Sequence, residues 1–201
     1  MKFRVILADP PWHFKVYDEK TGAGRSPSRH YQTQTLDWIC DLPVNQLSEK
    51  NCALFMWTTW PHVRNAFTVM DAWGFRYATL GFEWWKLNKR WQKGFYDLVG
   101  LQNYRMMESL FHFGNGYYAR ANSEICLLGI KGSMPVKVHD ERNFIIAPVR
   151  EHSRKPDEQY GKIERLYPNE TYLELFARHR RDGWEAFGNE IEDSINLEIM
   201  S

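Results

Sequence analysis

Four residues near the start of the chain, Asp9-Pro10-Pro11-Trp12, have the types and order needed to hold an aromatic amine. The Asp9 carboxylate and the Pro10 carbonyl can each accept one N–H bond from such an amine. These bonds draw the nitrogen toward tetrahedral geometry and stabilise the positive charge that develops as it attacks. The prolines fix φ and remove two N–H donors, so that nothing competes for these acceptors. Trp12 can then stack on a base, which is worth about 1–3 kcal/mol.

A purely structural explanation exists for the same four residues. In it, Pro10-Pro11 only ends a strand and the Trp12 side chain fills the core. Proline makes up about 5% of residues in an average protein and tryptophan is rarer, so the complete string seldom arises by chance. We therefore favour the functional interpretation, in which the string holds the exocyclic N6 of adenine.

The elements expected along the chain place Asp9 at the carboxyl end of a strand. Residues 3–8 are apolar and β-branched and stop at two prolines, which predicts a buried strand with Asp9 just past its carboxyl end. Apolar runs predict further strands over residues 53–57, 77–85, 123–130 and 172–177, and helical spacing predicts helices over residues 63–73 and 157–166. Strands that alternate with helices indicate an α/β fold with a mostly parallel sheet.

Several further segments, in this order, give the chain a resemblance to a known family. They are Tyr31, Leu54 to Thr58, Ala72 to Phe75, Trp85-Lys86, Gly114 to Gly116 with Arg120 and Glu124, Glu151 to Asp157, Leu173 to Arg178, Gly183-Trp184 and Gly188 to Glu190. Together with Asp9 to Trp12 they resemble the MT-A70 family of adenine-N6 methyltransferases, above all its small bacterial and phage-type members. The resemblance implies a Rossmann-like class I methyltransferase fold in permuted order, with a central, mostly parallel sheet flanked by helices. It spans nearly the whole chain, so we expect one methyltransferase domain over residues 1–201.

The resemblance also implies S-adenosyl-L-methionine as the cofactor. Lys155 would pair with the carboxylate of its methionine part, a role that suits a point charge. The other residues expected to bind the cofactor are Asp9, Glu174, Leu175, Phe176, Arg178, Asn189 and Glu190. The structural alternatives are that residues 174–177 form only a buried strand and that Lys155 is a solvated cation beside a helix start, where the helix dipole would disfavour it.

Two segments, residues 13–34 and about 86–120, are expected to face the nucleic-acid substrate. The first is rich in turn formers, and the second has six Lys and Arg against two acidic residues, a local surplus that the net charge of +1 conceals. The side chains expected to contact the substrate are Trp12, Tyr31, Lys86, Lys89, Arg90 and Arg120. The alternative is that the aromatic residues of the second segment only pack the domain. Because N6 is hidden inside a duplex, the base must be flipped out or taken from a single strand.

The remaining sequence features narrow the class of protein. The histidines show no ligand spacing, so no metal site is expected, and the three scattered cysteines fit a reducing cytoplasm. No apolar stretch approaches the ~20 residues needed to span a bilayer. We predict a DNA adenine-N6 methyltransferase, active alone, as a homodimer or as a heterodimer with a related subunit. The alternatives are an RNA adenine-N6 methyltransferase, a catalytically silent nucleic-acid-binding partner subunit, and an enzyme that methylates a small molecule or a protein amide, which an Asn at position 9 would have favoured.

Overall fold

The computed structural model describes residues 1–13, 33–89, 108–114, 118–150, 154–188 and 191. These residues form one seven-stranded sheet with the strand order β5-β3-β4-β2-β1-β6-β7. The strands are β1 (Phe3–Ala8), β2 (Ser48–Thr58), β3 (Arg76–Leu87), β4 (Ser123–Lys131), β5 (Phe144–Pro148), β6 (Tyr172–Leu175) and β7 (Trp184–Phe187). β4 runs antiparallel to both of its neighbours, β2 and β3, and every other pair in the sheet is parallel. The expected mostly parallel α/β sheet is therefore confirmed.

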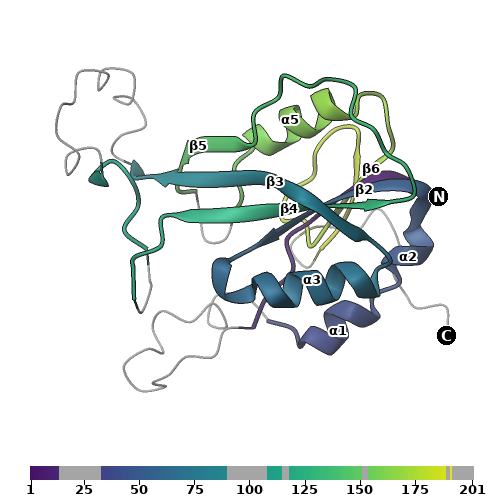
Figure 1. Cartoon of the computed structure of the whole chain (residues 1–201), viewed down its shortest axis with the longest axis horizontal. Coiled ribbons are helices and arrows are strands. Elements are labelled where there is room, and N and C mark those ends of the chain that lie inside the picture. The colour runs from purple at the N-terminus through teal and green to yellow at the C-terminus, as the bar shows by residue number, and fades with distance from the viewer. Residues whose placement is uncertain (14–32, 90–107, 115–117, 151–153, 189–190, 192–201) are drawn as a thin grey trace.

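Helices cover both faces of this sheet (Figure 1). They are α1 (Leu36–Asp41), α2 (Val44–Leu47), the 3-10 turn η3 (Trp60–His62), α3 (Val63–Ala72) and α5 (Glu158–Leu166). α1 and α3 pack on one face and α5 packs on the other, as Figure 1 shows. The arrangement is Rossmann-like, with helices flanking the sheet as expected.

The core consists of two apolar layers, one on each face of the sheet. In β2, Leu54 and Met56 point into the layer under α1 and α3, whereas Phe55 and Trp57 point into the layer under α5. Because successive strand residues point to opposite faces, a central strand covered on both sides needs an unbroken apolar run. This explains the unbroken apolar run of residues 52–57 in β2.

The structure differs from the sequence-based expectation at short elements and at the end of one strand. α1 has six residues, α2 has four and β7 has four, and such short elements show too few periods to be recognised. The strand expected over residues 172–177 ends at Leu175 because Phe176 adopts a φ of 64°, which no strand residue can have. In the part of the chain that is described, no helix has the length and apolar character required to cross a membrane.

Candidate active site

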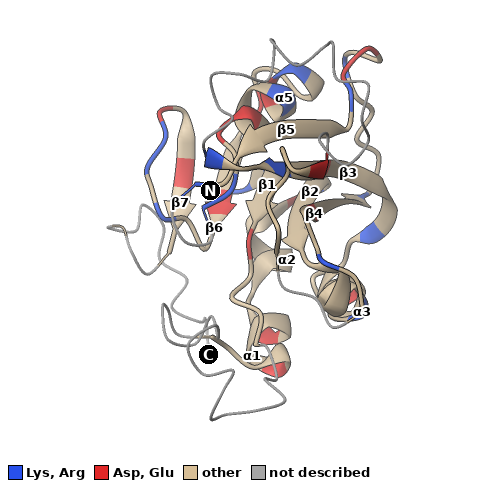
Figure 2. Cartoon of the chain, turned by 90° about the vertical axis from the view of Figure 1, so that its left-hand side faces the viewer, with Lys and Arg blue, Asp and Glu red and all other residues tan. Residues whose placement is uncertain are grey.

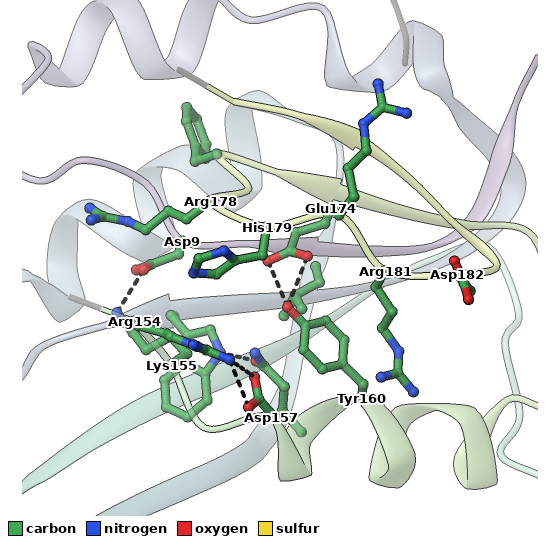
Figure 3. Close-up of a pocket in the computed structure, with 15 residues that line it drawn as sticks. Asp9, Arg154, Lys155, Asp157, Tyr160, Glu174, Arg178, His179, Arg181 and Asp182 are labelled. Carbon is green, nitrogen blue, oxygen red and sulfur yellow. Dashed lines mark hydrogen bonds and ion pairs between the residues drawn. The ribbon is translucent and has the colours of Figure 1, made fainter. Parts of the chain in front are cut away.

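A pocket of about 450 Å³ lies at the carboxyl ends of β1 and β6, on the face of the sheet that α5 covers (Figure 3). It is lined by Leu7, Asp9, Trp57, Arg154, Lys155, Asp157, Gln159, Tyr160, Glu174, Phe176, Arg178, His179, Arg180, Arg181 and Asp182. Ligands of α/β proteins bind outside the carboxyl ends of parallel strands, and this volume is in the range of small-molecule sites. The pocket is therefore a candidate active site.

The Asp9 carboxylate reaches the pocket because of the alternation along β1. Leu7 points toward α5, so Asp9, two residues later, points to the same side just beyond the strand. Lys155 Nζ donates to Asp9 Oδ2 at 2.7 Å. Burial raises the pKa of the Asp9 carboxyl, and the Lys155 ammonium opposes that shift without cancelling it. The pocket thus holds a carboxylate that is a stronger base than an exposed aspartate.

Pro10 and Trp12 depart from the roles expected of them. The main-chain N–H of Trp12 donates to the Pro10 carbonyl at 2.8 Å, so the expectation that nothing competes for this acceptor is wrong. The oxygen keeps a second lone pair, because a carbonyl can accept two hydrogen bonds. The Pro11 carbonyl accepts from the Gln34 N–H at 3.1 Å. This bond ties residues 9–12, here called the strap, to the chain beyond residues 14–32.

The Trp12 side chain belongs to the apolar core, as the structural alternative proposed. It is 5% exposed and packs in the layer under α1 and α3. Its Nε1 donates to the Trp57 carbonyl at 3.1 Å, and its ring stacks on His62 with centroids 5.9 Å apart. The indole therefore anchors the strap that carries Asp9, and its stacking on a substrate base stays a prediction.

Replacing Trp12 with phenylalanine tests this anchoring role. We expect Trp12→Phe to lower the free energy of unfolding by at least about 1 kcal/mol, because a buried carbonyl loses its donor. The matched control is Trp60→Phe, in which the tryptophan is 57% exposed and the loss should stay within about 0.5 kcal/mol. Urea unfolding measures both values, and equal losses would contradict the anchoring role.

Lys155 lies between two carboxylates instead of extending into solvent. Its side chain is 9% exposed, with Nζ 2.7 Å from Asp9 Oδ2 and 3.3 Å from Glu124 Oε2. Lys86 forms an ion pair with the other oxygen of Glu124. Burial alone would raise the pKa of Glu124, but Lys155 and Lys86 together outweigh burial and lower it to about 2. Glu124 is therefore ionised at any ordinary pH.

A second carboxylate in the pocket, Glu174, is held by a tyrosine. The Tyr160 hydroxyl donates to Glu174 and lies 3.1 and 3.0 Å from the two carboxylate oxygens (Figure 3). Burial raises the pKa of Glu174 to about 7, the Tyr160 hydrogen bond opposes the rise, and the negative charge of Asp9 adds to it. Burial likewise raises the pKa of the Tyr160 hydroxyl, so this group stays a donor.

The segment after β6 brings further residues to the pocket. Phe176 lines the pocket with a φ of 64°, a conformation that costs a non-glycine residue about 1–3 kcal/mol and is typical of functional sites. Arg178 also lines the pocket and is close enough to lower the pKa of Asp9. Leu175 does not line it. Because side chains alternate along β6, the Leu175 side chain points into the opposite apolar layer and away from this pocket, and the expected part of Leu175 in cofactor binding stays a prediction.

The turn between β6 and β7 gives the pocket a basic rim. Figure 2 shows the Lys and Arg positions of this turn along one edge of the sheet. Arg180 and His179 are exposed, whereas Arg181 forms an ion pair with Glu164 on α5. Gly188, just past β7, lies so close to Ala177 that a Cβ would be 2.0 Å from the Ala177 carbonyl oxygen. Gly188 is thus packed directly against the backbone of Ala177, in the turn that follows β6.

The residues expected to contact the nucleic acid differ in exposure, and two of them lie outside the described residues. Lys86 is only 18% exposed and is paired with Glu124, and its expected contact with the substrate stays a prediction. Lys89 and Arg120 are exposed, and the Arg120 guanidinium lies 5.1 Å from the centre of the exposed Phe113 ring. Tyr31, Arg90, Asn189 and Glu190 lie outside the described residues, as do most of the two segments expected to face the substrate.

Sequence reasoning gave Glu124 and Tyr160 no functional role. Glu124 stands in a segment that resembles the family, and Tyr160 lies in the helix expected over residues 157–166. The available signal for Glu124 was a carboxylate inside an otherwise apolar strand, where an acidic residue needs a buried partner. Within the described ranges, no group of His, Cys, Asp and Glu is arranged to hold a metal ion.

Comparisons with known proteins find matches along nearly the whole chain. The family profile named MT-A70 matches residues 3–190. The chain is 30% identical to the type II methyltransferase M.MunI of Mycoplasma sp, over 96% of this chain and 79% of that protein. It is also 30% identical to a putative N(6)-adenosine-methyltransferase MT-A70-like protein of Medicago truncatula, over 94% of this chain and 26% of that protein. Identity to the N(6)-adenosine-methyltransferase catalytic subunit METTL3 of Homo sapiens is 29%, over 98% of this chain and 29% of that protein. The chain thus spans most of the Mycoplasma relative and between a quarter and a third of the other two.

Proposed function

The chain belongs to the MT-A70 family, and from this premise we propose that it transfers a methyl group from S-adenosylmethionine to the N6 of adenine in a nucleic acid. One observation carries the proposal. Asp9 stands at the carboxyl end of β1, directed into a pocket and in contact with Lys155. A carboxylate with a raised pKa can accept an N6–H bond and then the proton that N6 must lose.

The pocket suits the proposed cofactor, which supplies an electrophilic methyl group on a sulfonium. Such a molecule carries an ammonium, a sulfonium and a carboxylate, so its site needs groups of both charges. Lys155 and Arg178 can face the carboxylate or the ribose, Asp9 and Glu174 can face the cationic groups, and Phe176 supplies an apolar wall. Arg178 and Phe176 come from the turn that the sequence assigned to the cofactor.

Asp9 and Pro10 can supply the groups that the reaction requires from the protein. N6 forms a bond to the methyl carbon as the carbon–sulfur bond breaks, and the electron pair of that bond stays on sulfur. N6 then carries a positive charge until it loses one proton, and the Asp9 carboxylate is placed to receive it. The free lone pair of the Pro10 carbonyl can accept the second N6–H bond and hold the amine in place.

We propose DNA as the polymer, by analogy with the type II methyltransferase whose length the chain covers to 79%. The relatives named for N(6)-adenosine make RNA the second candidate. The catalytically silent alternative is disfavoured, because Asp9 and Lys155 are both present and in contact. For the active form we keep three candidates, a monomer, a homodimer and a heterodimer with a related subunit.

The experiment that tests this proposal incubates the protein with methyl-labelled cofactor and four polymers of one sequence: single- and double-stranded DNA and single- and double-stranded RNA. We expect label in DNA, recovered as N6-methyladenine after digestion and mass spectrometry. Label in RNA alone would replace DNA by RNA as the substrate. Cofactor binding without label in any polymer would contradict the enzymatic proposal.

The raised pKa of Glu174 predicts how cofactor affinity depends on pH. A cofactor with a net positive charge binds the ionised carboxylate better, so affinity is lost as pH falls through about 7. If Glu174 takes up one proton when the cofactor is released, the Kd of the cofactor should rise about tenfold from pH 8 to pH 6. Calorimetric titration measures this change, and Glu174→Gln should abolish most of the slope. An unchanged slope in that variant would exclude Glu174 as the titrating group.

A further inference from the structure

Four charged side chains of alternating sign form a row, and two of them, Asp9 and Lys155, line the pocket. Lys86 at the end of β3 pairs with Glu124 on β4, Glu124 contacts Lys155 at 3.3 Å, and Lys155 contacts Asp9 at 2.7 Å. Opposite charges alternate and their formal sum is zero. The row runs from β3 across β4 to the catalytic end of β1.

The sheet fixes the far end of this row. β3 and β4 pair in antiparallel register, with Trp84 opposite Glu124, and the Lys86 N–H donates to the Asn122 carbonyl at 2.9 Å. The Lys86 ammonium also lies 4.9 Å from the centre of the Trp84 ring. The side chains of Lys86 and Glu124 are each 18% exposed, so their charges act through a medium of low dielectric constant.

We propose that Glu124 and Lys86 are positioning residues for methyl transfer, because Glu124 shares Lys155 with Asp9 and Lys86 controls how strongly Glu124 attracts it. The inference rests on the proposed function, in which Asp9 must accept a hydrogen bond from N6. An ammonium held by Asp9 alone would occupy the acceptor that the amine needs. Glu124 offers the same ammonium a second acceptor close by. Asp9 can therefore give up its hydrogen bond from Lys155 and accept one from N6, while Lys155 stays paired with Glu124.

The groups that set the ionisation of Asp9 come from every element packed around it. They are Lys155 before α5, Glu124 and Cys126 on β4, Glu174 on β6 and Arg178 after β6. Glu124 stays ionised, since its pKa is about 2, and Cys126 stays neutral, since burial raises the pKa of its thiol. Changes at Glu124 or Lys86 therefore act on Asp9 through fixed charge and through Lys155.

The two positioning residues carry opposite charges, so their neutral variants should shift Asp9 in opposite directions. Glu124→Gln removes a negative charge and leaves Lys155 with Asp9, which lowers the pKa of Asp9. Lys86→Met frees Glu124 to attract Lys155 away from Asp9, which raises that pKa. A general loosening of the site would not shift the pKa of Asp9 in opposite directions in the two variants. Water admitted to the site would move this pKa toward that of an exposed aspartate in both.

The test measures kcat against pH with saturating cofactor, so that the pH dependence of cofactor binding does not enter. The acid limb should move to lower pH in Glu124→Gln and to higher pH in Lys86→Met, each by at least about half a pH unit. The charge-conserving variants Glu124→Asp and Lys86→Arg should return the limb toward the wild-type position. Lys162→Met and Glu141→Gln, which break a similar Lys–Glu pair outside the pocket, should leave it unchanged.

A carboxyl ¹³C titration of Asp9 in the same full-length variants supplies a readout that needs no turnover, with Asp9→Asn to assign the signal. Shifts of opposite sign support the inference whether or not the wild type transfers a methyl group. Shifts of the same sign, or no shift in either variant, overturn it. A wild-type protein that binds cofactor and methylates no polymer would instead contradict the proposed function, and the titration would still decide the role of Glu124 and Lys86.

Discussion

Asp9→Asn will lower the rate of methyl transfer by at least about 100-fold, the loss typical when one preorganised hydrogen-bonding group is removed from a transition state. The amide oxygen can still accept one N6–H bond, but the side chain can neither take up a proton nor offset the positive charge that N6 acquires. Cofactor affinity should stay within a few-fold, because Lys155 keeps Glu124 as a partner. Single-turnover kinetics with saturating cofactor separates the two effects.

The control for this substitution is Asp71→Asn, which makes the same change at an exposed position on α3 and should leave the rate unaltered. The account requires that the fold survives in Asp9→Asn, and circular dichroism checks that requirement. Retention of more than about a tenth of the wild-type rate would show that Asp9 is not the acceptor for N6.

Lys155→Met will have the largest effect on stability, because it leaves Asp9 and Glu124 close together without the ammonium between them. Removing one partner of a buried ion pair costs about 3–5 kcal/mol. Lys86 still neutralises part of the charge on Glu124, so Asp9 bears most of the penalty. The same variant should lose measurable affinity for the cofactor, since the proposed contact with its carboxylate is gone.

The stability deficit of Lys155→Met should depend on pH with a definite sign. Without the ammonium, burial and the charge of Glu124 raise the pKa of the Asp9 carboxyl further above the value of about 4 that it has in the unfolded chain, whereas Glu124 keeps Lys86 as a partner. The folded variant then holds protons that the unfolded chain releases, so stability falls as pH rises. The deficit relative to wild type should be greatest near pH 8 and smaller near pH 5. Thermal melts across this range test the sign, with Lys162→Met as the control.

The position of Asp9 could be predicted from the sequence because local rules decide it. A buried strand that meets two prolines must end there, and alternation then settles which face the next carboxylate points to. The mostly parallel sheet followed from the same reasoning, because apolar runs of strand length alternate with helical periods. The helix that contains Tyr160 was expected over residues 157–166, and the structure has it over Glu158–Leu166.

The partners of these side chains could not be predicted, because they are set by contacts between distant segments. Lys86 was counted with a basic surface, but the β3–β4 register places it against Glu124, 38 residues away. Trp12 was expected to meet a base, yet its indole packs in the core and reaches the Trp57 carbonyl, 45 residues away. Local composition shows neither the register of two strands nor the packing of a ring. The sequence therefore indicated where these residues lie in the fold more reliably than what they touch.

The central claim is that this chain methylates the N6 of adenine through Asp9. The most direct measurement digests polymer that has been incubated with methyl-labelled cofactor and the wild-type protein, and identifies the labelled nucleoside by mass spectrometry and chromatography against standards. The account predicts label on N6 of adenine and its loss in Asp9→Asn. Label on another atom of adenine, on another base, or at an undiminished level in Asp9→Asn would contradict it.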